Sequence, residues 1–186
     1  MKKIILASQS PRRKEIMETA GYDFEIKVSG CEEIVPENVT PKEVAKSLAL
    51  QKAESVFKDN RDSIVIGADT IVVLGNEILG KPKNEVDAKE MLKKLSGNTH
   101  RVFTGIAVIS AEKTVNDVQE TEVNFYDLTD EEIDDYIKTG EPMDKAGAYG
   151  IQGRGCLFIN GICGDYFNVV GLPIALLSKV LQEFGE

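Results

Sequence analysis

The sequence contains few of the residues that bind metals or act as nucleophiles through sulfur or imidazole. It has three cysteines, Cys31, Cys156 and Cys163, without CxxC spacing, and a single histidine, His100. An odd number of widely spaced cysteines favours free thiols over a disulfide framework or a zinc site. A lone histidine with no cysteine nearby is a poor candidate for a metal centre or a triad, so a hydrogen-bonded structural role is expected for His100.

Long apolar runs and an excess of positive charge are also missing. No run approaches the roughly 20 residues of a membrane-spanning helix, and the apolar stretch at residues 4–7 is too short for a secretory signal. We therefore expect a cytoplasmic protein without membrane attachment. The net charge of −9 argues against a nucleic-acid-binding surface, but it leaves room for a small anion held by a few local cations.

The residues that are present describe an ordinary globular chain. With 186 residues, 42% of them hydrophobic, the chain is long enough for one domain with a sizeable core or for two small lobes that share a cleft. Strand and helix patterns alternate, which predicts an α/β or mixed sheet architecture. The patterns predict strands at 2–7, 22–29, 64–74, 77–79, within 101–127 and at 156–159, and helices at 11–20, 41–58, 85–96, 130–139 and from about 172.

Cations gather where a helix should begin. Ser10 and Pro11 are a typical N-cap and first helical residue, and Arg12, Arg13 and Lys14 follow in the first turn. Each cation opposes the helix dipole by about 0.3–1 kcal/mol. A bound phosphate would relieve this repulsion, because free N–H groups and arginines would both face it. A solvated basic turn is the alternative.

Two further charged residues fall in costly positions. Lys52 lies within the apolar stripe of the helix predicted at 41–58, either as a snorkelling side chain or as an ammonium directed into a cleft. Asp69 interrupts the nearly continuous apolar run SIVIGADTIVVL, which predicts a strand buried on both faces. An ionised carboxylate there needs a partner, a metal or a shifted pKa, so Asp69 is a candidate functional residue. A buried ion pair or a bulge after Gly67 is the structural alternative.

Two glycine-containing segments resemble phosphate-binding loops only superficially. GNEILGKP at 75–82 matches GxxxxGK but continues with Pro82, and a hairpin turn replaces the strand and helix that a P-loop needs. This excludes a nucleotide kinase of that type and leaves Lys81 as a lone cation. In GAYGIQGRG at 147–155, the glycines either form turns or let the backbone approach a flat ligand, to which Gln152 offers a donor and an acceptor.

Together these residues supply what a metal-bound polyphosphate requires. Arg12, Arg13, Lys52 and Lys81 can neutralise phosphates, and carboxylates can hold a divalent metal. The candidate carboxylates are Glu32, Glu33 and Asp69.

The same residues lie in motifs that resemble those of the Maf family of nucleoside triphosphate pyrophosphatases, also called septum-formation inhibitors. The motifs span nearly the whole chain in order: SQSPRR at 8–13, Glu33, LALQKA at 48–53, GADTIV at 67–72, LGKP at 79–82, TG at 104–105, AGAYGIQGRG at 146–155 and GDYFNVVGLP at 164–173. The resemblance implies a single domain over residues 1–186, with a long mixed sheet and two lobes around a central cleft, similar to inosine triphosphate pyrophosphatases.

The resemblance also implies a reaction and a role for each residue. The reaction is NTP + H₂O → NMP + pyrophosphate with Mg²⁺ or Mn²⁺, and a homodimer is the family expectation. Asp69 is the implied proton acceptor and also a candidate metal ligand beside Glu33, although Glu32 leaves the choice of ligand open. Arg13, Lys52 and Lys81 would stabilise the leaving pyrophosphate, and Ser8 would contact phosphate.

Three positions carry the implied substrate preference. Arg12, Thr70 and Gln152 resemble the set found in the dTTP/UTP branch, and a glutamine amide can accept from the N3–H of uracil or thymine and donate to a carbonyl. The alternative is a non-enzymatic, nucleotide-binding regulator of cell division or septum formation. Such a regulator would not need Asp69 in an apolar strand.

Overall fold

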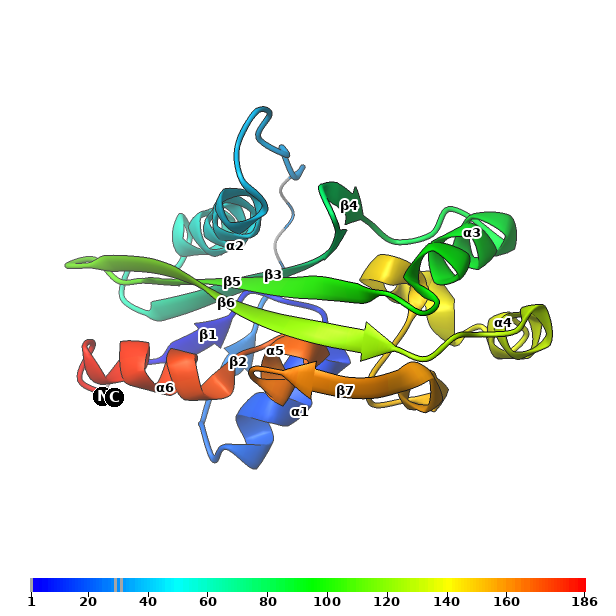
Figure 1. Ribbon diagram of the computed structural model, residues 1–186. Helices are drawn as coiled ribbons and strands as arrows, with labels where there is room; N and C mark the ends of the chain where they lie inside the picture. Colours follow the sequence, from blue (N-terminus) through cyan, green and yellow to red (C-terminus); the bar gives the residue numbers. More distant parts are fainter. Residues whose placement is uncertain (1, 29, 31) are drawn as a thin grey trace. The chain divides into compact units, whose positions relative to one another are not determined.

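The computed structural model describes residues 2–28, 30 and 32–186 (Figure 1). Two compact units divide it: unit 1 comprises residues 1–70, 104–119 and 171–186, and unit 2 comprises residues 71–103 and 120–170. The elements are β1 (Ile4–Leu6), α1 (Pro11–Thr19), β2 (Glu25–Ile26), α2 (Pro41–Phe57), β3 (Ile64–Leu74), β4 (Glu77–Leu79), α3 (Glu85–Leu95), β5 (Thr99–Ile109), β6 (Thr114–Phe125), α4 (Asp130–Ile137), β7 (Ile159–Cys163), α5 (Tyr166–Val170) and α6 (Ile174–Gln182), with 3₁₀ helices η1 (Glu141–Asp144), η2 (Ala146–Ala148) and η3 (Arg154–Phe158).

The strands form a mixed seven-stranded sheet in the order β2-β1-β3-β5-β6-β7, and β4 pairs with β3. β1 is parallel to both β2 and β3, whereas β4 is antiparallel to β3 and β7 is antiparallel to β6. The strands β3, β5 and β6 each begin in one unit and end in the other. The mixed α/β fold class predicted from the sequence is confirmed.

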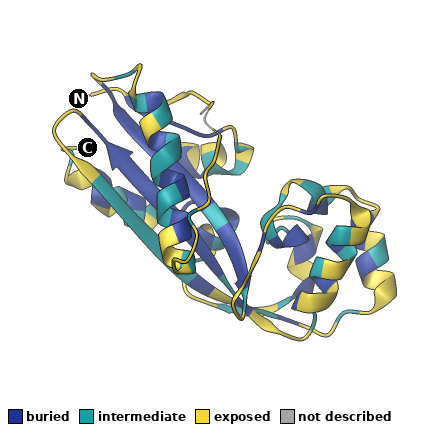
Figure 2. Ribbon diagram, turned by 90° about the horizontal axis from the view of Figure 1, so that it is seen from above, coloured by how far each residue is buried: buried dark blue, intermediate teal, exposed yellow. Residues whose placement is uncertain are grey.

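In unit 1, alternate residues of the strands face opposite sides of the sheet. Ile5 and Val65 pack against Ala49, Ala53 and Val56 of α2. Figure 1 shows α2 on this face and α1 and α6 on the other, and Figure 2 shows the strands between them as buried. A strand covered on both faces can carry the nearly unbroken apolar run seen in β3.

Glycines on two strands let α2 approach the sheet closely. A Cβ added at Gly67 of β3 would lie 2.2 Å from the carbonyl oxygen of Ala49, and one at Gly105 of β5 would lie 2.2 Å from that of Ala45. These distances are shorter than any van der Waals contact, so only glycine fits at both positions. The close approach brings the next turn of α2, which carries Lys52, down onto β3.

The helix starts follow the sequence signals. Thr40 and Thr129 form capping boxes with Glu43 and Glu132, and the Asn84 side chain accepts from the backbone N–H of Asp87. The longest helix, α2, has 17 residues. None of the helices in the described part of the chain is long and apolar enough to cross a membrane.

The core of unit 2 contains an aromatic cluster around His100. The imidazole Nε2 lies 2.8 Å from the Tyr149 hydroxyl, and both rings pack edge-to-face with Phe125. Burial lowers the pKa of His100 to about 4, so the ring is neutral at pH 7. The predicted structural, hydrogen-bonded role of His100 is confirmed.

Two sequence predictions of local structure are wrong in detail. The half-buried strand predicted at 22–29 shrinks to the two exposed residues of β2, because β2 pairs only with β1 and no layer covers it. The strand predicted at 156–159 is mostly the 3₁₀ helix η3, and β7 begins only at Ile159. The short helix α5 was not predicted. Cys156 and Cys163 are free, exposed thiols as expected, and Cys31 lies outside the described residues.

Candidate active site

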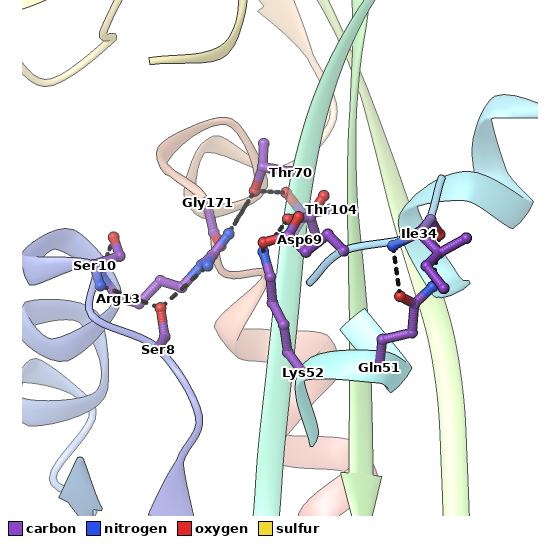
Figure 3. Close-up of polar contacts among 11 residues, drawn as sticks. Ser8, Ser10, Arg13, Ile34, Gln51, Lys52, Asp69, Thr70, Thr104 and Gly171 are labelled. Carbon is purple, nitrogen blue, oxygen red and sulfur yellow. Dashed lines mark hydrogen bonds and ion pairs between the residues drawn. The ribbon is translucent and has the colours of Figure 1, made fainter. Parts of the chain in front are cut away.

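Asp69 and Lys52 meet on the face of β3 that α2 covers. The Asp69 carboxylate, whose residue is only 9% exposed, accepts a 2.5 Å hydrogen bond from the Lys52 ammonium (Figure 3). Residues 65, 67 and 69 share one face of the strand, so the approach at Gly67 sets the height of Lys52 above Asp69. The sequence left open a snorkelling side chain or an ammonium directed into a cleft, and the structure shows the Lys52 ammonium bound to the Asp69 carboxylate.

Glu33 adds a second carboxylate to the same ammonium. Its Oε1 lies 3.1 Å from the Lys52 Nζ, and its side chain is 45% exposed on the segment that precedes α2. Two carboxylates therefore converge on one cation, and the group carries a net charge of −1 when all three are ionised. Glu32 is exposed.

Arg13 is held by neutral oxygens on three sides. Its Nε donates to the Gly171 carbonyl at 2.7 Å, and its two terminal nitrogens donate to the hydroxyls of Ser8 and Thr70, each at 3.2 Å. Burial lowers the pKa of Arg13, an effect that the negative charge of Asp69 partly offsets. The described residues give the guanidinium no carboxylate within ion-pair distance.

The structure shows where two of the cations at the start of α1, Arg13 and Lys14, direct their side chains. Ser10 accepts a long, 3.5 Å bond from the Arg13 backbone N–H, while Ser8 is buried and its hydroxyl accepts from the Ser10 N–H. Arg13 folds back toward Ser8, and Lys14 pairs with Glu18 one turn later. No acidic residue occupies the first turn of α1. The helix start therefore combines a half-buried guanidinium with a first turn that contains no acidic residue.

Neighbouring residues of β3 serve opposite sides of the sheet. Asp69 faces α2, whereas the hydroxyl of Thr70 accepts from Arg13 and lies 2.9 Å from the buried hydroxyl of Thr104 on β5. β1 pairs with β3 only as far as Ile66, so both residues lie beyond that pairing. β3 thus carries the Asp69–Lys52–Glu33 group on one face and the Thr70–Arg13 group on the other.

Lys81 and Gln152 both belong to unit 2, and both are exposed. The turn at Gly75, with φ of 59°, joins the antiparallel strands β3 and β4, which confirms that GNEILGKP is a hairpin and not a P-loop. The role of each side chain stays a prediction.

The segment around Gln152 is held by a residue that the sequence did not reveal. Glu141 accepts from the backbone N–H groups of Arg154 and Gly155 and from the hydroxyl of Tyr136. A Cβ at Gly153 would lie 2.3 Å from the Glu141 carboxylate, so this glycine is required by close packing. Nothing in the sequence pattern marks Glu141, because it follows a glycine in an acidic region.

The fold and the site define a class of protein: a mixed α/β protein in which one strand carries a carboxylate–ammonium pair on one face and a hydroxyl bound to a half-buried arginine on the other. Such a set suits phosphate chemistry. The chain belongs to the Maf family, described as Maf-like protein, which matches residues 3–184. The family resemblance inferred from the motifs is thereby confirmed.

Individual relatives agree with this assignment. A protein of Bacillus cereus (strain G9842) named dTTP/UTP pyrophosphatase is 58% identical over 184 residues, which cover 99% of this chain and 96% of that protein. A protein of the same name from Bacillus thuringiensis subsp. konkukian (strain 97-27) is 56% identical and covers 100% and 97%. The solved structure of the Staphylococcus aureus Ham1 protein shares the fold, with a TM-score of 0.50, 16% identity and coverage of 68% and 73%.

Proposed function

We propose that this protein is a nucleoside triphosphate pyrophosphatase that hydrolyses dTTP and UTP to the monophosphate and pyrophosphate. The observation that carries the proposal is the ion pair of Asp69 and Lys52 on a buried strand, joined by Glu33. A buried ion pair costs desolvation energy and rarely adds stability, so its presence favours a chemical role. The names of the 56–58% identical relatives support the same activity.

Asp69 is proposed as the proton acceptor. Its carboxylate would take a proton from the water that attacks the α-phosphorus, and the hydrogen bond from Lys52 fixes the orientation of the acceptor oxygens. Because the residue is buried and the strand is rigid, the acceptor needs no rearrangement when substrate binds.

Arg13 is proposed to bind the phosphates that leave as pyrophosphate. A guanidinium that is desolvated and lacks a carboxylate partner attracts an anion strongly, and no acidic residue in the first turn of α1 opposes this attraction. Ser8 is proposed to contact phosphate through its O–H, since its oxygen already accepts from Ser10 and Arg13. Lys52 and Lys81 are proposed to neutralise further phosphate charge.

A divalent metal fits the carboxylates around Lys52. Glu33 and Asp69 offer hard oxygen ligands to one point, where the ammonium shows that a cation is stabilised. Within the described residues no group of three or more histidine, cysteine or carboxylate side chains is placed to hold a metal. Mg²⁺ is often bound by one or two carboxylates together with substrate phosphates, and Glu33 and Asp69 are the proposed pair, with Glu32 next to them in sequence. The bound ion would neutralise phosphate charge and acidify the attacking water.

The substrate preference is proposed to depend on Arg12, Thr70 and Gln152. Thr70 is already tied to Arg13, so a change there would also disturb the proposed phosphate site. A single domain with two lobes, a cytoplasmic location and a homodimer stay predictions. A purely regulatory, non-enzymatic role is not favoured, because binding alone would not require a buried acid with a fixed ammonium partner.

A panel of nucleotides tests the function directly. Each of the common ribo- and deoxyribonucleoside triphosphates is incubated with the protein and Mg²⁺, and pyrophosphate and orthophosphate are measured separately. We expect pyrophosphate and nucleoside monophosphate in equal amounts, fastest from dTTP and UTP. Release of orthophosphate alone, or no turnover of any nucleotide, would contradict the proposal.

A further inference from the structure

The carboxylate of Glu33 lies on a segment that apolar packing does not hold. The next residue, Ile34, has a side chain that is 72% exposed, and Val35 is also exposed. Residues 27–40 contain no helix or strand among the described positions. A carboxylate on such a segment would sample many positions unless something else fixed the backbone.

Gln51 supplies this fixation through its side-chain amide (Figure 3). Its Oε1 accepts from the Ile34 N–H at 2.9 Å, and its Nε2 donates to the Ile34 carbonyl at 2.8 Å. The amide thus binds both polar groups of one peptide residue, as a neighbouring strand would. Gln51 is the residue directly before Lys52 on α2, so adjacent side chains of one helix hold the backbone of Ile34 and the carboxylate of Glu33.

The two groups of Ile34 determine the orientation of the amide, and a third contact is compatible with it. Nε2 also donates to the Ser47 hydroxyl, one helical turn earlier, at 3.1 Å. A flipped amide would place Nε2 against the Ile34 N–H, so that two donors would face each other. The three bonds use both N–H donors of Gln51 and leave the amide a single favourable orientation.

We propose that Gln51 is a positioning residue that places Glu33 against Lys52 and Asp69; the proposal rests on the pyrophosphatase function proposed above. Gln51 touches neither member of the Asp69–Lys52 pair through the contacts described, and it acts through the backbone of Ile34. Removing the amide leaves Lys52 and Asp69 in place but releases Glu33.

A double-mutant cycle tests this route. Gln51→Met keeps the length and helix propensity of the side chain and removes all three hydrogen bonds. We expect kcat/KM for dTTP to fall about tenfold in the wild-type background and less than about twofold in a Glu33→Gln background, because the two changes act on one group. A ratio of the two losses of five or more supports the proposal, and a smaller ratio overturns it.

A second measurement does not depend on activity. Hydrogen exchange of the Ile34 amide should speed up at least about tenfold in Gln51→Met, because its acceptor is lost. Gln182→Met, at the exposed end of α6, is the matched control and should change neither quantity. Should Gln51→Met fold poorly, Gln51→Ala carries the same expectations.

The two proposals fail in different ways. A wild-type chain that hydrolyses no nucleotide would contradict the proposed function, and the Ile34 exchange rate would then decide for or against the Gln51 contact. An active wild type whose Ile34 amide exchanges at the same rate in Gln51→Met would overturn the positioning role alone.

Discussion

In unit 1 the charged groups of Asp69 and Arg13 face charged or polar partners, whereas in unit 2 the imidazole of His100 is packed among aromatic rings. Asp69 has Lys52 and Arg13 has three oxygen acceptors, but the Nδ1 of His100 is buried without a hydrogen-bond partner. Burial with partners keeps a group charged and oriented, and burial without them makes the neutral form the stable one. The same physical cost therefore accompanies a charged, oriented group in unit 1 and a neutral packing element in unit 2.

The largest expected effect is on catalysis. Asp69→Asn keeps the shape of the side chain but removes the proton acceptor, so we expect kcat for dTTP to fall by about 10²–10⁴. The fold should persist, because the amide still accepts a hydrogen bond from Lys52. Steady-state release of pyrophosphate and the thermal midpoint are the measurements.

Asp62→Asn is the matched control for this variant. Asp62 is an exposed aspartate in the turn that leads into β3, so its substitution should change kcat by less than about twofold. Undiminished turnover in Asp69→Asn would remove Asp69 from the chemistry and would leave the buried ion pair as a structural feature.

The next effect is on the packing that creates the charged site. Gly67→Ala places a Cβ 2.2 Å from the Ala49 carbonyl oxygen, and α2 can relieve the overlap only by moving away from β3. We expect a loss of about 1–3 kcal/mol in the free energy of unfolding, together with lower kcat, because Lys52 moves with α2. Chemical denaturation measures the first and dTTP hydrolysis the second.

Gly161→Ala is the comparison for that variant, since an added Cβ there meets nothing within 4 Å. Its free energy of unfolding should stay within about 0.5 kcal/mol of the wild type. Equal losses in the two variants would show that the approach of α2 at Gly67 has no special importance.

The buried, neutral His100 of unit 2 should make the free energy of unfolding depend on pH in the acidic range. Because the pKa of His100 lies near 4 in the folded chain and near 6.5 when unfolded, the unfolded state binds the extra proton between these values. The contribution of His100 to the free energy of unfolding is complete above pH 6.5. It falls with decreasing pH by up to about 1.4 kcal/mol per pH unit, until about pH 4. Urea unfolding at several pH values measures it.

His100→Gln removes this titration, and the difference in stability between the two chains cancels the contribution of the carboxylates. A difference that does not change between pH 7 and pH 4.5 would mean that His100 titrates normally in the folded protein, which would contradict its neutral, aromatic environment.

The sequence predicted most of the charged region and little of what supports it. Asp69 and Lys52 were recognisable because a charge in an apolar pattern is costly, and the bounds of β3 followed from its apolar run. Gln51 and Glu141 were missed because a polar residue on a helix surface or near a turn has no such cost. Their partners are backbone groups far along the chain, which no local pattern encodes.

The sequence predictions failed where hydrogen bonds to distant residues, and not the local apolar pattern, determine the backbone conformation. The alternation at 22–29 indicates a strand, but only two residues find a partner in β1. The apolar residues at 156–159 indicate a strand as well, yet the backbone N–H groups of Arg154 and Gly155 are bound by Glu141 and the chain turns into η3. Tertiary contacts override local preference at both places.

The smallest expected effect distinguishes Lys52 from Arg13. Lys52→Met removes the ammonium from between Glu33 and Asp69, so Mn²⁺ should bind the nucleotide-free protein about fivefold more tightly, which corresponds to about 1 kcal/mol. Arg13→Met should change Mn²⁺ affinity by less than about twofold, because Arg13 contacts only neutral oxygens. Titration calorimetry measures both, and equal changes in the two variants would mean that Glu33 and Asp69 do not form the cation site.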